Sequence, residues 1–222
     1  MKIAIMQPYF LPYLPYFQLM NAVDTFVIYD DVQFIKNGWI NRNRILVNND
    51  PHTFTIPLRK SSTFDKINQK ELIEDRHDIR KIIKTIEENY SKKIYFNQFL
   101  IKSLFRSQNT LIDLIINSFK IISDHSGITT KLILSSELSK NNDLKGQDKV
   151  INICKNLGCT DYINSVGGQT LYDKKTFKKN GIVLHFLKNC AKDKNINLSI
   201  LHNLLSFSKE ELKELLKDFI LI

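Results

Sequence analysis

The chain begins with two short apolar runs on either side of a stretch with helical character. The first run, residues 2–6, reads KIAIM, and the second, residues 24–30, reads DTFVIYD. Runs of this kind are typical of buried strands, and a short helix is expected between them around residues 13–21. A strand–helix–strand unit almost always crosses over right-handed and leaves its two strands parallel. The beginning of the chain therefore predicts an α/β fold with a parallel sheet.

A β-hairpin is predicted directly after this unit. WINRNRILV (39–47) and HTFTIPL (52–58) have strand character, and the residues between them favour a turn. We assign the turn to Asn49, Asp50 and Pro51, whose side chains are typical of turns.

The middle of the chain has a helical pattern. Apolar residues recur at helical spacing in residues 77–90, and two more helices are predicted at 94–106 and 111–125, with Gly127 as a helix stop. We treat residues 72–126 as a helical insertion in the α/β fold.

Strands and helices alternate again after this insertion. Strands are predicted at residues 129–134, 161–164 and 182–187, and helices at residues 146–158, 172–181 and 208–220. We therefore predict one α/β domain over residues 1–222, with a mainly parallel, Rossmann-like sheet flanked by helices, a β-hairpin and a central helical insertion.

The composition is that of an ordinary globular protein, with 43% hydrophobic and 25% charged residues. No apolar run approaches the roughly 18–20 residues that a bilayer span requires, and the first residues do not read as a secretory signal. We expect a cytoplasmic protein without membrane insertion. The net charge of +9 favours an anionic ligand, but no basic tail or recognisable nucleic-acid module is present, which argues against nucleic acid as the partner.

Three cysteines, an odd number in a chain of this size, do not make a disulfide framework. Cys154, Cys159, His185 and Cys190 are residue types that bind zinc, but they lack the tight pairs of structural zinc sites. We interpret them as small apolar residues and predict no metal site from them.

Polar side chains are expected to meet where the first two strands end. Ligands of open parallel sheets bind beyond the carboxyl ends of the strands. The first strand leads into QPYFLPY and the second into DDVQFIKN, so six side chains should converge: Gln7, Tyr9, Asp30, Asp31, Gln33 and Lys36.

The segment QPYFLPYLPYF combines these polar groups with large apolar ones. Its prolines stiffen the loop and lower the cost of ordering it around a ligand. Four side chains are expected to pack against the sheet instead of binding a ligand: Phe10, Leu11, Leu14 and Phe17.

Three residues are candidates for acid–base chemistry. Asp30 and Asp31 could orient a hydroxyl or an amine, bind Mg²⁺ or serve as a general base, and the alternative for both is turn formation after a strand. His77 lies off the apolar stripe of its helix or at its first turn, and is a candidate for proton transfer or an ordinary exposed histidine.

The sequence NRNR, residues 41–44, points to anion binding. Residues two apart in a strand share a face, so Arg42 and Arg44 should project together, and paired guanidinium groups suit a phosphate or a carboxylate. Trp39 could stack on a ligand or cover the hairpin, and Asn41 is a further candidate contact. The alternative is a solvated edge strand.

A second candidate lies in SVGGQT, residues 165–170. Gly167 and Gly168 leave their backbone amides accessible to a ligand, and Gln169 follows them. G-x-S-x-G, P-loop, G-x-G-x-x-G, H-E-x-x-H and C-x-x-C motifs do not occur, so standard serine-hydrolase, P-loop and dinucleotide functions lose their main support.

The sequence IMQPYFLPYLPYFQLMNAVDTFVIYDDVQFIKNGWINRNRI closely resembles the opening of the WbqC-like family of bacterial proteins. TIPL, SSEL, ICKNLGCTDYINSVGGQTLYD and NLSIL also match the pattern of that family. The resemblance implies a role in lipopolysaccharide, capsule or other surface-glycan synthesis. It further implies transfer of an acyl or aminoacyl group, such as glycine, to an amino sugar carried on a nucleotide.

Under this hypothesis, Arg42, Arg44 and Lys36 bind phosphate or carboxylate, and Tyr9 and Trp39 contact a ring. An activated acyl or aminoacyl donor is expected, and the sequence leaves a need for Mg²⁺ and the oligomeric state open.

The remaining roles follow from the same hypothesis. Asp30 or Asp31, with His77, would deprotonate the acceptor, and the amides of Gly167 and Gly168 would stabilise an oxyanion. Two other functions stay open: a nucleic-acid-binding module with a basic surface, and a non-catalytic protein of glycan assembly.

Overall fold

The strand–helix–strand unit at the start of the chain forms the centre of the main sheet. The computed structural model describes residues 1–192 and 195–222. Strand β1 (Lys2–Met6) pairs in parallel with β2 (Thr25–Ile28), and helix α1 (Leu14–Asn21) connects them. The predicted parallel unit is therefore confirmed.

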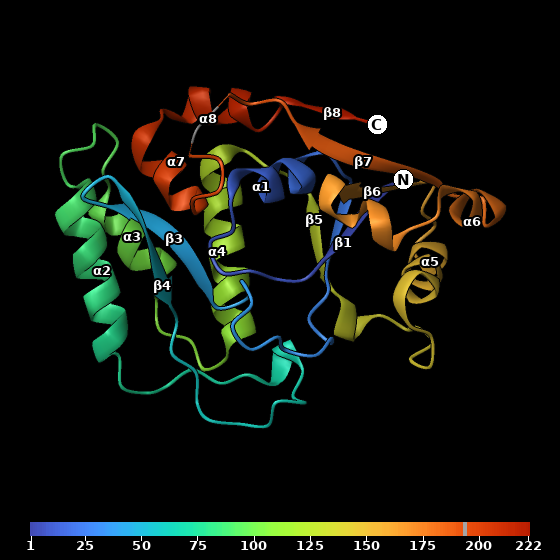
Figure 1. The fold of residues 1–222 in the computed structure, drawn as a ribbon, viewed down its shortest axis with the longest axis horizontal. Coiled ribbons are helices and arrows are strands. Elements are labelled where there is room, and N and C mark those ends of the chain that lie inside the picture. Colours follow the sequence, from blue (N-terminus) through green and yellow to red (C-terminus); the bar gives the residue numbers. More distant parts are fainter. Residues whose placement is uncertain (193–194) are drawn as a thin grey trace.

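This unit extends into a six-stranded sheet with the order β5-β2-β1-β6-β7-β8 (Figure 1). The added strands are β5 (Lys131–Leu134), β6 (Asp161–Ser165), β7 (Val183–Asn189) and β8 (Phe219–Leu221). All neighbours pair in parallel except β7 and β8, which are antiparallel. The order reverses beside β1, so the gap between the carboxyl ends of β1 and β6 is the topological switch point of the sheet.

Helices cover both faces of this sheet, and each face has its own buried cluster. Ala4 belongs to the cluster that contains α1 and α4 (Leu111–Ser126), whereas Ile3 belongs to the cluster that contains α5 (Gly146–Asn156) and α6 (Lys174–Lys179). This division follows from the two-residue period of a strand, which sends neighbouring side chains to opposite faces. The prediction of a mainly parallel α/β sheet flanked by helices is confirmed.

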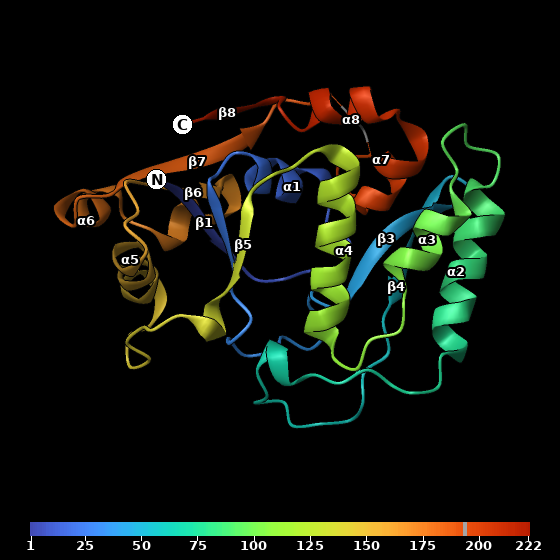
Figure 2. The same cartoon turned by 180° about the vertical axis from the view of Figure 1, so that it is seen from behind.

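A second layer lies beyond α4 (Figure 2). It contains an antiparallel hairpin of β3 (Arg42–Val47) and β4 (Asp50–Thr55), which is separate from the main sheet. Helices α2 (His77–Tyr90), α3 (Gln98–Leu104) and α7 (Ile200–Ser206) complete this layer, with α2 and α7 in contact with β3. The predicted hairpin is confirmed.

The hairpin turn differs from the prediction. Asn48 and Asn49 have φ angles of 51° and 67°, and they form a two-residue turn, while Asp50 and Pro51 already belong to β4. Two successive left-handed residues match the twist of the strands, and Asn tolerates this conformation better than most residues.

Other boundaries also differ from those that the sequence predicts. The predicted helix at 94–106 is confined to α3, and the predicted helix at 208–220 ends as α8 (Lys209–Leu215), after which Phe219 enters β8. Helix α7 was not predicted. Three short 3₁₀ segments complete the chain: η1 (Ile67–Gln69), η2 (Ser135–Glu137) and η3 (Val166–Leu171).

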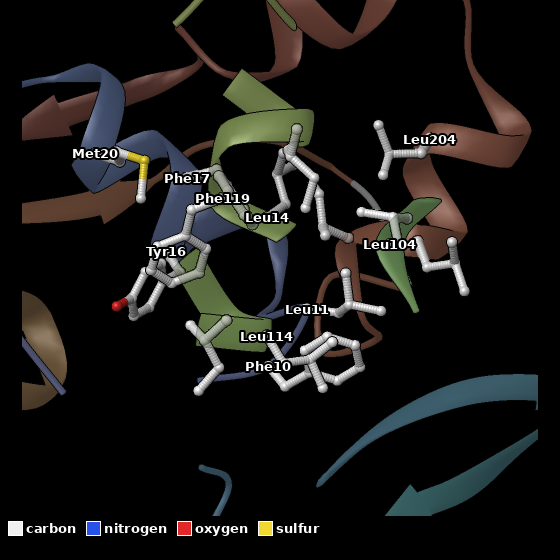
Figure 3. Packing of buried hydrophobic residues seen from close by; sticks show 14 of the residues in the cluster. Phe10, Leu11, Leu14, Tyr16, Phe17, Met20, Leu104, Leu114, Phe119 and Leu204 are labelled. Carbon is white, nitrogen blue, oxygen red and sulfur yellow. The ribbon is translucent and has the colours of Figure 1, made fainter. Parts of the chain in front are cut away.

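The apolar side chains of the Pro/aromatic segment are buried between the sheet and the second layer (Figure 3). Phe10, Leu11, Leu14 and Phe17 are completely buried, as predicted. Figure 3 shows them in one cluster with Phe119 and Leu114 of α4. The segment therefore joins the two layers of the molecule.

Within residues 1–192 and 195–222, no helix is long enough and apolar enough to span a bilayer.

Candidate functional site

A pocket of about 290 Å³ opens where the Pro/aromatic segment meets the hairpin. It is lined by Tyr9, Tyr13, Trp39, Asn43, Arg44 and Asn197. These six side chains supply rings, amides and a guanidinium group, and none of them is a carboxylate. The lining therefore suits a ligand that has both a ring or sugar face and a negative charge.

Two arginines lie against one tryptophan at the mouth of this pocket. The guanidinium carbons of Arg42 and Arg44 are 5.2 Å and 4.8 Å from the ring centroid of Trp39, which is 40% exposed. Within the described residues, neither arginine forms an ion pair, and the buried Nε of Arg42 has no hydrogen-bond partner. No carboxylate therefore competes with an anion for either guanidinium group, while the ring holds their planes in place.

A strained residue fixes the shape of the loop beside the pocket. Leu11 has a left-handed φ of 47°, and its carbonyl accepts hydrogen bonds from Asn43 Nδ2 at 2.6 Å and Ser199 Oγ at 2.8 Å. The backbone N–H of Ser199 donates to the carbonyl of Arg44 at 2.8 Å. These bonds tie the loop, β3 and the start of α7 together, so the pocket is organised before any ligand binds.

The two aspartates after β2 are held by hydrogen bonds and an ion pair. The Asp30 carboxylate accepts from Asn68 Nδ2 at 3.0 Å and from the backbone N–H of Ser136 at 2.9 Å. Asp31 pairs with Lys140 at 3.0 Å, and their side chains are only 8% and 3% exposed. Both carboxylates therefore bind neighbouring segments to the edge of the sheet.

The environment of Asp31 favours its charged form. Burial opposes ionisation, but the Lys140 ammonium, the neighbouring Ser135 hydroxyl and the charge of Lys149 outweigh it and lower the pKa of Asp31. A carboxylate with a lowered pKa is a weak base. Lys140 also occupies the position that a cation would take beside Asp31, so the pair of aspartates does not fit a Mg²⁺ site.

Tyr29 lies next to this ion pair and was not among the predicted site residues. Burial, followed by the charge of Asp31 and the proximity of Tyr172, raises the pKa of Tyr29 to about 12. Lys149 lies 6.0 Å from the centre of its ring. Tyr29 is therefore protonated at neutral pH and does not serve as a general base there.

The two glycines after β6 differ in their surroundings: Gly168 is buried and Gly167 is exposed. A Cβ atom on Gly168 would lie 3.0 Å from Asn164 Oδ1, a tight contact, so the small size of glycine allows close packing here. Gly167 and Gln169 are exposed within η3. None of the three lines the pocket of Tyr9 and Trp39.

The other predicted site residues are spread around the carboxyl edge of the sheet. The half-buried Gln7 contributes its carbonyl to a 2.9 Å hydrogen bond from the hydroxyl of Tyr16, and Gln33 Nε2 donates to the carbonyl of Thr63 at 3.0 Å. Lys36 is exposed.

Asn41 and His77 lie outside the pocket. Asn41 is buried, and its Nδ2 donates to the carbonyl of Ile56 at 2.8 Å. His77 is exposed at the start of α2, where its backbone N–H donates to the Asp75 carboxylate. Within the described part of the chain, no hydrogen bond or ion pair joins His77 to Asp30 or Asp31.

Of the six side chains expected to converge, only Tyr9 and Asp31 belong to the two groups that the structure forms. One group is the pocket of Tyr9, Trp39 and Arg44, and the other is the buried pair of Asp31 and Lys140. Tyr13, Asn43 and Asn197 line the pocket but were not predicted. Tyr13 lies in the segment QPYFLPYLPYF, and Asn197 begins NLSIL, so both belonged to stretches that the sequence had already marked.

Residues 1–192 and 195–222 contain no group of three or more His, Cys, Asp or Glu side chains that could hold a metal ion. Cys154 and Cys159 are buried, whereas Cys190 is exposed. His185 forms a contact of 3.2 Å with Asp161.

A larger, more open hollow of about 830 Å³ lies along α8. Its walls come from one continuous stretch, residues 207–218, and carry mixed acidic and basic side chains. Functional groups from distant parts of the sequence do not meet in this hollow, so the pocket of Trp39 is the better candidate.

Comparison with known proteins identifies the family of the chain. A family model described as the WbqC-like protein family matches residues 7–214. The chain is 27% identical over 180 residues to the uncharacterized protein Rv1507c of Mycobacterium tuberculosis (strain ATCC 25618 / H37Rv), a match that covers 79% of this chain and 77% of that protein. No solved structure matches the chain significantly. Because the family model spans nearly the whole chain, including every residue that lines the pocket, this protein belongs to the WbqC-like protein family.

Proposed function

We propose that the protein binds a nucleotide-linked amino sugar at the pocket of Trp39 and Arg44 and transfers an acyl or aminoacyl group, such as glycine, to its amino group. The product would enter a bacterial surface glycan. One observation carries the proposal: two arginines without carboxylate partners lie on one exposed tryptophan beside a pocket whose lining has no acidic group. This arrangement favours a ligand with a ring and a phosphate.

The size of the pocket determines how such a ligand would lie. A volume of about 290 Å³ is at the lower end of small-molecule pockets, which span roughly 300–1,000 Å³. It accommodates the sugar or the base but not a whole nucleotide-sugar. We assign the diphosphate to Arg42 and Arg44 at the mouth and the ring to Tyr9, Tyr13 and Trp39.

The polar groups of the pocket would orient the enclosed ring. The side chains of Asn43 and Asn197 reach the pocket and suit the hydroxyl and amide groups of a sugar. Burial raises the pKa of Tyr9 and of Tyr13, so their phenols are protonated at neutral pH and donate hydrogen bonds.

In the proposed reaction the amino nitrogen attacks the acyl carbonyl carbon. A nitrogen–carbon bond forms, the bond between the acyl carbon and its leaving group breaks, and the proton of the amine passes to the leaving group or to water. Asp31 is ion-paired and has a lowered pKa, so we give it a positioning role. The chain would therefore act mainly by holding an activated donor and the amine together.

Isothermal titration calorimetry with nucleotide-linked amino sugars tests the binding step. We expect Arg44→Ala to weaken binding about tenfold or more, because a charge-assisted hydrogen bond and a stacking contact are lost. Arg59→Ala is the matched control, since Arg59 is exposed and pairs with Glu71 and Glu74 away from the pocket. Equal affinity of the wild-type protein and Arg44→Ala would refute the assigned site.

Mass spectrometry of the sugar after incubation with acyl and aminoacyl donors tests the transfer step. A gain in mass equal to one acyl group supports the transferase. Binding without any gain in mass would favour the non-catalytic role in glycan assembly. Salt-sensitive binding of unrelated single-stranded nucleic acids, without binding of nucleotide-sugars, would favour the nucleic-acid module.

A further inference from the structure

A cluster of exposed apolar side chains lies at the far end of the second layer, away from the candidate site. Ile94 is 84% exposed, Phe99 is 81% exposed and Tyr95 is 40% exposed. They belong to the connection between α2 and α3 and to the first turn of α3, and Figures 1 and 2 show that this connection extends past the end of α2. Three such side chains within six residues differ from the single exposed apolar residues that are normal on protein surfaces.

Basic residues without carboxylate partners surround this cluster. Residues 91–106 contain four cations and no Asp or Glu, and all four cations are exposed: Lys92, Lys93, Lys102 and Arg106. None of the four forms an ion pair within the described residues. Phe99 and Lys102 are three residues apart in α3, so an apolar and a basic side chain share its exposed face.

The nearest carboxylates in the sequence already have partners. Glu87 accepts a hydrogen bond from Gln98 Nε2 at 2.9 Å, and Glu88 lies 3.7 Å from Lys84. Residues 84–106 carry five cations against these two carboxylates, so the electrostatic field around the exposed apolar cluster is positive.

We propose that this tip, residues 92–102, docks onto the anionic surface of a lipid membrane, with Ile94, Tyr95 and Phe99 entering the headgroup region and the lysines binding lipid phosphates. Apolar side chains that project beside cations are the pattern of interfacial membrane anchors. The observed charge favours this occupant over a second copy of the chain, because the three unpaired lysines on each tip would repel one another. Ile94, the most exposed of the three, has no ring to stack on a base, whereas the headgroup region of a membrane accommodates all three side chains.

Membrane docking goes beyond the proposed transferase and does not depend on it. The tip adjoins the end of β3 at which Asn48 donates to Asn89 at the end of α2, whereas the pocket lies at the Arg42 end of that strand. Docking through the tip would leave the pocket open to solvent. The two activities can therefore be tested separately.

Sedimentation with vesicles tests the proposal directly. We expect the full chain to bind vesicles of mixed phosphatidylglycerol and phosphatidylcholine and to leave pure phosphatidylcholine vesicles unbound. The double variant Ile94→Ser/Phe99→Ser should reduce the partition coefficient about tenfold or more, because both apolar anchors are lost. Phe64→Ser is the matched control, since Phe64 is 82% exposed and lies outside the tip.

Two double variants test how much the lysines of the tip contribute to binding anionic vesicles. Lys92→Glu/Lys93→Glu should lower binding to anionic vesicles about tenfold or more, and Lys178→Glu/Lys179→Glu, which makes the same charge change on the exposed end of α6, should lower it much less. Unchanged circular dichroism of each variant establishes that the fold is intact.

Fluorescence places the contact at the tip. In a Trp39→Phe background, the Phe99→Trp emission should shift to the blue on addition of anionic vesicles, while the Phe64→Trp emission should not. Absence of vesicle binding by the wild-type protein, equal binding to neutral and anionic vesicles, or full binding by Ile94→Ser/Phe99→Ser would each overturn the proposal. Self-association of the wild-type protein that the double variant abolishes, without vesicle binding, would assign the tip to a second copy instead.

Discussion

Trp39 is the residue on which the candidate site depends most. It contacts Arg42 and Arg44 and lines the pocket, yet it is 40% exposed and contributes little to the core. A ligand contact with this exposure can be removed without loss of the fold.

We expect Trp39→Ala to weaken binding of a nucleotide-linked sugar about tenfold, since the ring contact is lost and both guanidinium groups lose their support. The melting temperature should change little. Trp39→Phe should retain most of the affinity. Calorimetry and thermal unfolding of the same three proteins check this, and a large loss of stability in Trp39→Ala would contradict it.

The pair of Asp31 and Lys140 has the opposite character, because both side chains are almost completely buried. Removing one partner leaves an unpaired buried charge, so we expect Lys140→Met to lower the free energy of unfolding by about 3–5 kcal/mol. The exposed pair of Lys217 and Glu214 offers a control, and Lys217→Met should cost about 1 kcal/mol or less. Urea unfolding measures both, and equal effects would be inconsistent with burial as the cause.

The same pair predicts a dependence of stability on pH. The folded-state pKa of Asp31 lies below its usual value of about 3.9, so the unfolded chain takes up a proton first as the pH falls. The stability that Asp31 contributes is present above about pH 4 and is lost as the pH falls through its folded-state pKa. Asp31→Asn should flatten this acid limb in unfolding experiments between neutral and acidic pH, whereas an unchanged limb would argue against the assignment.

Among the elements, the hairpin of β3 and β4 places the arginines and depends on its turn. Asn48 and Asn49 both have left-handed backbone conformations, which are unfavourable for residues other than glycine, with asparagine the most tolerant. Asn–Gly is the preferred pair for such a turn.

We therefore expect Asn49→Gly to leave the hairpin intact and to stabilise the protein by up to about 1 kcal/mol, and Asn49→Val to destabilise it by about 1–2 kcal/mol. Chemical unfolding of the two variants and the wild-type protein measures the difference. A stable Asn49→Val variant would mean that the turn has a different conformation.

At the scale of the whole molecule, α4 holds the sheet and the second layer together. Its Phe119 ring lies 5.5 Å from Tyr16 and 5.8 Å from Phe17, measured between ring centroids. Both partners belong to α1, so this contact joins the first unit of the sheet to the predicted insertion at residues 72–126.

Such packing leads us to expect one cooperative unfolding transition, in line with the predicted single domain. Phe119→Ala should lower the free energy of unfolding by about 3–5 kcal/mol. Circular dichroism, which reports on all helices, and Trp39 fluorescence, which reports on the second layer, should give coincident curves. Separate transitions would show that the insertion folds as its own domain.

The order of strands and helices could be predicted because it depends on local sequence. The short apolar runs of the strands, the helical spacing of residues 77–90 and the stop at Gly127 are visible without any tertiary contact. The hairpin turn was assigned wrongly because residues 48–51 all favour turns, and only the pairing of Val47 with Asp50 shows which two of them form it. The strand at Phe219 was missed because it depends on pairing with β7, which is distant in the sequence.

The sequence by itself determined the parallel unit, the family resemblance and the shared face of Arg42 and Arg44, since each depends on residue type and short spacing. Only the tertiary structure decided which polar groups meet. It placed Arg44 beside Tyr9 and Asn197, and it paired Asp31 with Lys140 from a distant loop. The reason is physical: hydrophobic packing and parallel pairing bring these distant segments together. The residues next to a charged side chain in the sequence do not show which charge will pair with it or how deeply the pair will be buried.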